Sequence, residues 1–452
     1  MKTRTYKCIQ FSIYFFTFLM LESEVNSRAE ILLGSQYVIQ IYALGLLCTA
    51  FGYFLFALSS GKGPKITRWN VPYIISSLLC LVSVSTLLYA SNRTLYFFSS
   101  VLSLLSFGFI GGHVHFNCSL LFSTEKRPGL MLGISAGAGV ILQFIFQNLI
   151  PFNAIIIIGV ILCVFISFIM PIEANPDTDS GAETDPQVLK TKDLILPVIA
   201  TAIMTMVLTT NDDLMVMKNA AGEVHLFSFT RLFYALGLML SGIITDIKKQ
   251  NWLPFSCVAS MMLSVIACVF LSKPSTYNLN MSVMYFYSGF YVMYFTAVFM
   301  SMAANTKRPA FTAGLGRIMR SVVASLFTLF LYIAKIDFSI SFLIILNCTL
   351  SIFLLVLFTV TKKLYPVSSK DAPSKTFPSP EETVLKMGEL YSLTEREKET
   401  IFHLLYSEDG VQEIADKLFI SRRVLQRYIS SIYEKTGVHS RIGLYQLRDQ
   451  IK

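Results

Sequence analysis

Long apolar segments recur along the first 361 residues of this chain and are absent from its last sixty. A helix that crosses the roughly 30 Å hydrocarbon core of a bilayer needs about 20 apolar residues, with a range of roughly 17–25. Only 14% of all residues are charged, against about 25% in a soluble globular chain. The segments predict an all-helical membrane domain over 1–361. They lie at 7–21, 33–58, 71–90, 95–122, 129–149, 152–172, 194–210, 225–245, 253–271, 280–303, 311–334 and 337–361.

The first segment is short and has two interpretations. Lys2, Arg4 and Lys7 precede an apolar core, and the stretch from Val25 to Ser27 fits a cleavage site, as in a secretory signal. Alternatively, the segment is the first of twelve spanning helices. Both interpretations leave the C-terminus on the same side of the membrane.

Lysine and arginine are distributed unevenly between the loops. The loops on the side of both termini carry 16 of them, and those on the opposite side carry 5. Because cytoplasmic loops are enriched in Lys and Arg, we expect a multi-pass protein of the cell membrane with both termini in the cytoplasm.

Three short matches reveal an internal repeat. RWNVP ends at Pro72 and QNWLP at Pro254, which are 182 residues apart, and the two KRP loops end at Pro128 and Pro309, which are 181 apart. Gly108 and Gly289 also lie 181 apart, each in the segment before a KRP loop. The offset favours two six-helix halves in the same orientation, with the first segment kept as a helix.

Two parallel six-helix repeats resemble the major facilitator superfamily over roughly residues 1–361. One loop supports the resemblance: Gly242, Asp246 and the pair Lys248 and Lys249 match that superfamily's G-x-x-x-D-R/K-x-G-R/K-R/K-like motif after span 8. The equivalent loop, 60–65, lacks the aspartate. Because the superfamily uses this motif in gating, the departure weakens the case that the domain transports.

Polar residues at mid-membrane depth are functional candidates because burying them in hydrocarbon is costly. At about 1.5 Å per residue, Arg320 lies roughly 15 Å deep, and Arg317 lies one turn nearer the cytoplasm on the same face. We expect no carboxylate at that depth, with Asp212 and Asp213 near the outer end of their span. Two interpretations remain open: the arginines bind an anionic small molecule, or they have a structural role in which they cap backbone carbonyl groups or reach Asp246 as ion pairs. The candidate ligand-binding residues are Arg317, Arg320, His113, Asn117, Tyr291 and Tyr294.

No group of residues indicates catalysis, so we expect neither an enzyme nor a bound cofactor. The eight cysteines form no CxxC pair, which argues against a metal site. His113 and His115 are two residues apart on a helix and point to different faces, which makes chelation unfavourable.

The chain changes character after residue 361. Residues 362–391, rich in Pro, Ser and Lys, are expected to form a flexible cytoplasmic linker. Residues 392–452 then carry the signals of four short helices. A capping box from Thr394 to Glu397 starts the first, Gly410 precedes the second, Ser421 caps the third, and Gly437 ends it.

This tail closely resembles the LuxR-type (GerE-like) helix-turn-helix. In that family the third helix enters the major groove of double-stranded DNA, and the fourth often mediates dimer contacts. The matching positions are Leu393-Thr394, Arg396-Glu397, Glu413-Ile414-Ala415, Leu418, Ile420-Ser421, Ile432-Tyr433, Lys435, Gly437-Val438 and Arg441.

The tail departs from the family at the positions of two phosphate-contacting lysines, which are Gln412 and Gln426 here. Val424, Tyr428 and Thr436 stand where the family usually has Thr, His and Leu, and Gly410-Val411 replaces its Ser/Thr-Asn. We expect arginines of the third helix to supply the missing charge; the alternative is that they form only a solvated face. The candidate DNA-binding residues are Arg422, Arg423, Gln426, Arg427, Ser421 and Gln412.

Together these features favour a membrane-embedded one-component transcriptional regulator. A transporter-like domain would sense a small molecule or the state of the membrane and control the tail. The expected partners are double-stranded DNA, membrane lipid, a small-molecule ligand and a second copy of the chain through its C-terminal domain. The alternative is a secondary transporter of a small solute with a regulatory helix-turn-helix tail.

Overall fold

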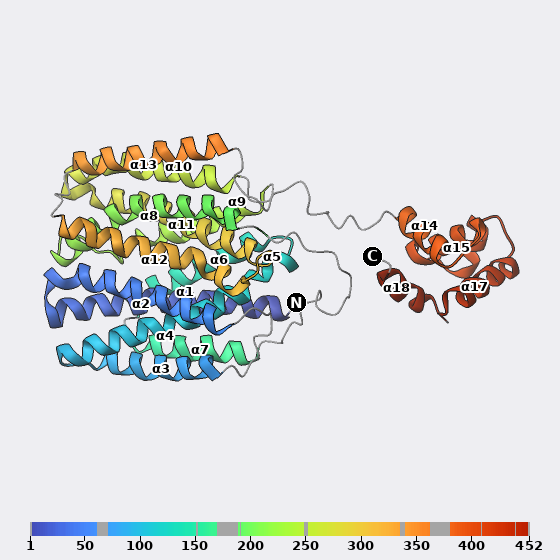
Figure 1. Ribbon diagram of the computed structural model, residues 1–452, viewed down its shortest axis with the longest axis horizontal. Helices are drawn as coiled ribbons and strands as arrows, with labels where there is room; N and C mark the ends of the chain where they lie inside the picture. The colour runs from blue at the N-terminus through green and yellow to red at the C-terminus, as the bar shows by residue number, and fades with distance from the viewer. Residues whose placement is uncertain are drawn as a thin grey trace. The chain divides into compact units, whose positions relative to one another are not determined.

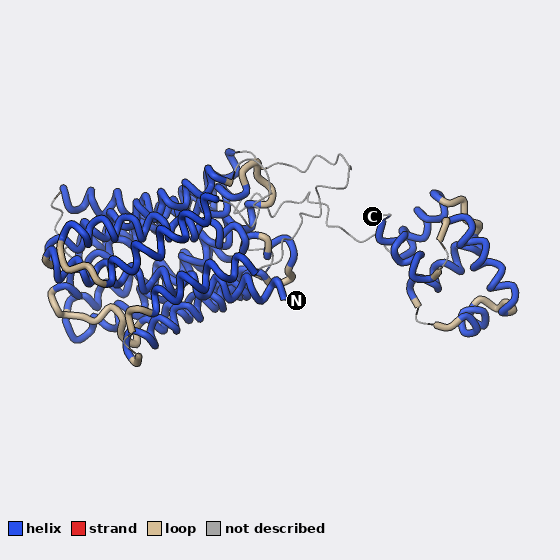
Figure 2. The backbone as a smooth tube through the Cα atoms, turned by 90° about the horizontal axis from the view of Figure 1, so that it is seen from below, coloured by secondary structure: helices blue, strands red, loops and turns tan. Residues whose placement is uncertain are grey.

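A computed structural model describes residues 2–60, 71–150, 152–169, 189, 191–247, 252–334, 340–361, 380–407, 409–438 and 440–450. The chain divides into two compact units, Met1–Ser369 and Lys370–Lys452. All regular elements in the described residues are helices, as Figures 1 and 2 show. The first unit is a bundle of long helices, and the second is a small domain of short ones.

Each expected span falls on a helix of the first unit. Within the part of the chain that the structure describes, ten helices are long and apolar enough to cross a membrane, and α7 and α9 are shorter apolar helices. The bounds are α1 Lys2–Leu33, α2 Val38–Ser59, α3 Val71–Leu88, α4 Arg93–Ser119, α5 Leu121–Thr124, α6 Pro128–Asn148, α7 Ile155–Ile169, α8 Thr191–Ala220, α9 Arg231–Thr245, α10 Leu253–Ala267, α11 Tyr277–Ala303, α12 Pro309–Ile333 and α13 Ile340–Thr361.

Two helices are longer than their apolar segments predicted. The helix α1 continues past residue 21, and α8 continues past residue 210, so Glu22, Asp212 and Asp213 lie within helices. The expectation that no carboxylate lies near the arginines was therefore wrong, because Glu22 and Asp212 line the same cavity as Arg320. A charged residue ends the apolar segment in the sequence. It does not end the helix when its side chain faces an internal cavity.

The two halves of the bundle repeat one packing arrangement. In the first half α2 packs against α4, and in the second α9 packs against α11. A Cβ built on Gly52 would lie 2.1 Å from the carbonyl oxygen of Leu105, and one built on Gly237 would lie 2.4 Å from that of Phe286. Both contacts need glycine, and they face Gly108 and Gly289 respectively, the pair that marked the sequence repeat.

The halves also meet each other in equivalent ways, through α6 with α9 and through α12 with α2. We call the end of the bundle at which α1 begins and α13 ends the base (Figure 1). There Gly129 and Gly133 of α6 pack directly on α9, and a Cβ on Gly133 would lie 2.6 Å from the carbonyl oxygen of Leu238. Asp246, which follows α9, accepts hydrogen bonds of 2.8 Å from the amides of Gly129 and Leu130.

From residue 380 onward, the described residues of the second unit form five helices: α14 Pro380–Leu390, α15 Glu395–Tyr406, α16 Val411–Lys417, α17 Arg422–Thr436 and α18 Arg441–Gln450. Its caps follow the predicted signals. Thr394 and Glu397 form the capping box, the Ser421 side chain accepts from the amide of Val424, and Gly437 ends α17 with φ of 70°. A left-handed residue at this position suits glycine, which has no Cβ.

Helix α14 lies in the segment expected to be linker. The linker up to residue 379 is outside the described residues, but from Pro380 the chain is helical. Val384 and Met387 of α14 are buried in the core of the second unit together with Ile401, Leu404 and Ile432. The unit thus has a hydrophobic core of its own, to which α14 contributes.

Candidate nucleic-acid interface and membrane cavity

One face of α17 is packed and the other is exposed. Leu425 and Ile432 are fully buried, and Thr436 is buried below them. The opposite face carries exposed side chains, and none of its three arginines forms an ion pair within the described residues. These exposed side chains are Arg422, Arg423, Gln426 and Arg427. Unpaired arginines on a rigid helix are available for phosphate or base contacts.

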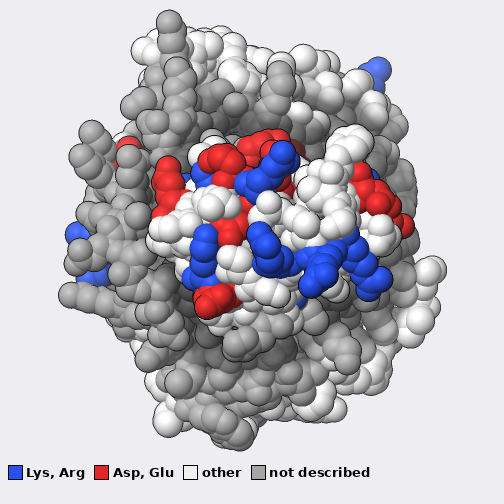
Figure 3. Space-filling view, turned by 90° about the vertical axis from the view of Figure 1, so that its right-hand side faces the viewer, with Lys and Arg blue, Asp and Glu red and all other residues white. Residues whose placement is uncertain are grey.

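The remaining predicted DNA-binding residues lie beside this helix. Ser421 is exposed at its N-terminus, and Gln412 is exposed on α16, where its amide donates to Asp416 Oδ1 at 3.0 Å. In the space-filling view of Figure 3, lysine and arginine side chains form a band next to a group of acidic ones. Ile432 belongs to the core, and the partly buried Tyr433 packs against it.

A buried carboxylate fixes α17 against α15. Glu397 Oε2 accepts from Lys435 Nζ at 2.7 Å, and Oε1 accepts from Ser431 Oγ at 2.6 Å. The same carboxylate accepts from the Thr394 amide at 2.7 Å. Burial raises the pKa of Glu397, but the hydrogen bonds from Lys435, Ser431 and Thr394 outweigh it and lower that pKa to about 2. The ionised carboxylate of Glu397 thus fixes the orientation of α17.

Arg441 has a similar positioning role at the start of α18. Its guanidinium donates to the carbonyl oxygens of Leu404 at 2.7 Å, of Asp409 at 2.9 Å and of Ser407. The last carbonyl groups of a helix have no intrahelical partner. Arg441 therefore satisfies the end of α15 and holds the loop that precedes α16.

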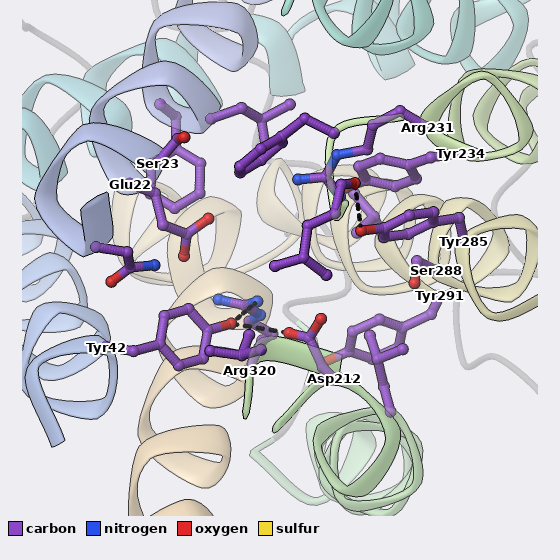
Figure 4. A pocket seen from close by; sticks show the side chains of 18 of the residues that line it. Glu22, Ser23, Tyr42, Asp212, Arg231, Tyr234, Tyr285, Ser288, Tyr291 and Arg320 are labelled. Carbon is purple, nitrogen blue, oxygen red and sulfur yellow. Dashed lines mark hydrogen bonds between the residues drawn. The ribbon is translucent and has the colours of Figure 1, made fainter. Parts of the chain in front are cut away.

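The first unit contains a cavity of about 90 Å³ between its two halves (Figure 4). Its walls come from α1, α2, α8, α9, α11 and α12 and from the loop before α9. The polar and charged lining residues are Glu22, Ser23, Asn26, Tyr42, Asp212, Arg231, Tyr234, Tyr285, Ser288, Tyr291, Arg317 and Arg320.

A tyrosine connects two of the charges. The Tyr42 hydroxyl donates to Asp212 Oδ2 at 3.0 Å and accepts from Arg320 Nη2 at 3.4 Å. Figure 4 shows Arg320 and Asp212 on either side of this hydroxyl. Tyr42 comes from the first half of the bundle and the two charges from the second, so this chain of hydrogen bonds crosses between the halves.

Aromatic rings surround the other two arginines. The Arg317 guanidinium carbon lies 4.8 Å from the ring centre of Phe18 and 5.5 Å from that of Phe295. The Arg231 carbon lies 4.7 Å from the ring of Tyr285 and 5.7 Å from that of Tyr234. Such cation–π contacts are worth about 0.5–2 kcal/mol each and leave the N–H donors available.

Only part of the predicted ligand site lines the cavity. Arg317, Arg320 and Tyr291 do so, and Tyr291 shares a hydrogen bond of 2.5 Å with Thr205 Oγ1. Three predicted residues lie outside the lining. Asn117 and His113 lie 3.0 Å apart, Nδ2 to Nε2, and the His113 ring is 4.4 Å from that of Tyr73. Tyr294 is fully buried.

Sequence reasoning missed the two carboxylates, Arg231 and Tyr42. A signal for Glu22 was present, because Asn26 lies one helical turn away on the same face of α1 and also lines the cavity. No local pattern identifies Arg231, which begins α9 and reaches the cavity only through the packing of the halves.

Comparison with known proteins identifies the folds of both units. Residues 391–447 match the family described as "Bacterial regulatory proteins, luxR family", so the second unit contains a LuxR-type helix-turn-helix domain. The match confirms the resemblance of the tail. No curated protein sequence matches the chain.

Two solved structures resemble the first unit. One is titled as the human organic anion transporter MFSD10 (TETRAN); it is 12% identical with a TM-score of 0.52, and the match covers 79% of this chain and 98% of that one. The other is titled as the Major Facilitator Superfamily transporter FucP in the outward conformation; it is 11% identical with a TM-score of 0.54, and covers 78% and 99%. The first unit therefore has the major-facilitator fold, and the chain is a multi-pass membrane protein.

Proposed function

We propose that this chain is a membrane-embedded one-component transcriptional regulator. Its major-facilitator-like unit senses a small molecule and controls DNA binding by the LuxR-type domain. The observation that carries the proposal is the exposed face of α17, where three arginines without ion-pair partners in the described residues lie on a LuxR-type domain. The same chain holds a membrane unit with a charged cavity.

The distribution of loop charge supports a cytoplasmic location for both termini. Lys and Arg number 16 on the side of the termini and 5 on the other. The DNA-binding domain would then lie in the cytoplasm, the compartment that holds the DNA. Charge is polarised within the domain: the part from Gly410 to Lys452 has eight Lys/Arg against four Asp/Glu, which suits a polyanion, whereas the first helix is acidic.

The position of the cavity supports a sensing role. Its polar and charged lining comes from both halves of the bundle, with Glu22 and Tyr42 from the first and Asp212, Arg231 and Arg320 from the second. A solute that contacts lining residues of both halves stabilises the arrangement of the halves in which both sets of residues reach it. A ligand shifts a conformational equilibrium only by its difference in affinity for the two states, and a bridging contact provides such a difference.

A transporter with a regulatory tail is the second candidate. It is favoured by the contact between Asp246 and the amides of Gly129 and Leu130, which closes the base between the halves. The two solved structures described above are titled as transporters. Against it, the matching loop after α2 lacks the aspartate in the sequence.

The test compares the two activities in the intact protein. Chromatin immunoprecipitation of the full-length chain should recover discrete promoter sequences, and the variant Arg423→Ala with Arg427→Ala should lose them at equal abundance in the membrane. Reconstituted liposomes should show no solute accumulation. Uptake without promoter recovery would replace the regulator with the transporter.

A further inference from the structure

Charges of both signs line the cavity without pairing with one another. Arg231, Arg317 and Arg320 face Glu22 and Asp212, yet among the described residues no arginine–carboxylate pair of this set lies within the 4.0 Å that defines an ion pair. Figure 4 shows the carboxylate of Glu22 pointing into the open centre. The lining thus carries three positive and two negative formal charges.

Several donors in this lining also lack acceptors. Within the described residues, Arg231 Nε, Arg317 Nε and Arg320 Nη1 are buried without a hydrogen-bond partner. Arg317 is only 4% exposed, so solvent does not replace that partner. A buried charge without a partner destabilises the fold. The arrangement persists because aromatic rings hold Arg317 and Arg231 in place and Tyr42 separates Arg320 from Asp212.

We propose that the cavity binds a small zwitterion of the amino-acid class, whose carboxylate meets the arginines and whose ammonium group meets Glu22 and Asp212. This inference deepens the proposed function, on which its regulatory meaning rests. A simple anion would satisfy the arginines but leave both carboxylates unpaired and repelled. A simple cation would leave three arginines unpaired. A zwitterion provides a negative group for the arginines and a positive group for the two carboxylates.

The carbon skeleton of such a solute would lie against the aromatic lining. Phe18, Tyr234, Tyr285 and Tyr291 flank the space between the charged groups. The first half supplies a carboxylate through Glu22, and the second supplies all three arginines. One molecule would therefore contact both halves of the bundle, the first through Glu22 and the second through Asp212 and the arginines.

The first experiment measures thermal melting of the full-length protein in detergent with each protein amino acid in turn. For every amino acid that raises the melting temperature, two analogues follow: the acid that lacks the amine and the amine that lacks the carboxylate. We expect at least one amino acid to stabilise the protein and both of its analogues to bind at least roughly tenfold more weakly, since a hydrogen bond to a charged group is worth about 1.5–3 kcal/mol. No shift with any amino acid, or equal binding of the acid analogue, would overturn the proposal.

Matched variants test the assigned groups. Glu22→Gln should weaken amino-acid binding roughly tenfold or more while leaving the affinity for the acid analogue unchanged or higher. Glu24→Gln is the control, because Glu24 lies on the same helix, pairs with Arg28 at 2.6 Å and does not line the cavity. Unchanged amino-acid binding by a folded Glu22→Gln protein would remove Glu22 from the site.

Promoter occupancy, measured with the same amino acid, separates this inference from the proposed function. Binding without any change in occupancy would sink the sensor function and leave the zwitterion site standing. A change in occupancy caused equally by the acid analogue would leave the sensor standing and overturn the zwitterion site.

Discussion

The ammonium group of Lys435 lies 2.7 Å from Oε2 of Glu397, and this contact joins α17, the helix that carries the exposed arginines, to α15. Glu397 is 4% exposed, so its charge depends on the partners that surround it. The resemblance to the LuxR family includes both residues. Their roles here are to position α17, since the side chains that face outward are the arginines on its other face.

The Glu397 contact predicts an acid-sensitive second unit. Its pKa of about 2 lies below the ordinary glutamate value of about 4.3, so the interaction contributes fully above that ordinary value and is lost as the pH falls towards 2. Urea unfolding of residues 370–452, which have their own core, should show stability falling across that window. Glu397→Gln should cost about 2 kcal/mol at neutral pH and flatten the dependence. The exposed Glu399→Gln is the control, and an equally steep acid loss in Glu397→Gln would contradict the assignment.

The arginines of α17 predict salt-dependent DNA binding. Replacing Arg423 and Arg427 together by alanine should weaken binding to every duplex and reduce the slope of log affinity against log salt by about 1.8, which is roughly 0.9 for each phosphate that the protein no longer neutralises. Both side chains are exposed, so the melting temperature should not change. Arg396→Ala, on α15, serves as the control for the loss of a positive charge away from α17. An unaltered slope in the double variant would exclude both arginines from the phosphate contacts.

The fork of hydrogen bonds from Arg441 predicts that lysine cannot replace it. A lysine ammonium carries its donors on one nitrogen, whereas the guanidinium donates from three nitrogens and reaches three carbonyl groups at once. Arg441→Lys should destabilise the second unit by roughly 2 kcal/mol, which corresponds to about 8–16 °C in melting temperature for a domain of this size. Arg422→Lys should leave the melting temperature unchanged. Equal stability of the two variants would show that the fork contributes little.

The contact between Asp246 and α6 predicts that the substitution Asp246→Asn loosens the base of the bundle. Amides in the first turn of a helix have no intrahelical acceptor, and Asp246 accepts from those of Gly129 and Leu130. In Asp246→Asn one acceptor becomes a donor that faces an amide. Hydrogen exchange of the peptide that contains Gly129 and Leu130 should therefore quicken severalfold in the full-length protein. Glu125→Gln, at the same end of the bundle, is the control, and unchanged exchange in Asp246→Asn would show that the contact does not hold α6.

Local signals predicted the second unit well because each acts over a few residues. The capping box at Thr394, the cap at Ser421 and the left-handed Gly437 all formed where the sequence placed them. Helix α14 escaped prediction because its own sequence, PEETVLKMGEL, is short and polar. Val384 and Met387 form an apolar face on α14, and this face stabilises the helix only when it packs into the core of the domain.

The amino-acid sequence alone determined the two-part organisation, the number and place of the apolar helices, their repeat and the exposed arginines of α17, because all of these depend on composition, periodicity and spacing along the chain. Tertiary structure alone decided which charged groups share a cavity. Glu22 and Asp212 are 190 residues apart in the sequence, and the carboxylates meet Arg231, Arg317 and Arg320 only where the two halves pack together. A charged residue within an apolar helix shows from the sequence that it needs polar partners inside the bundle. Only the packing of the other helices decides which groups those partners are.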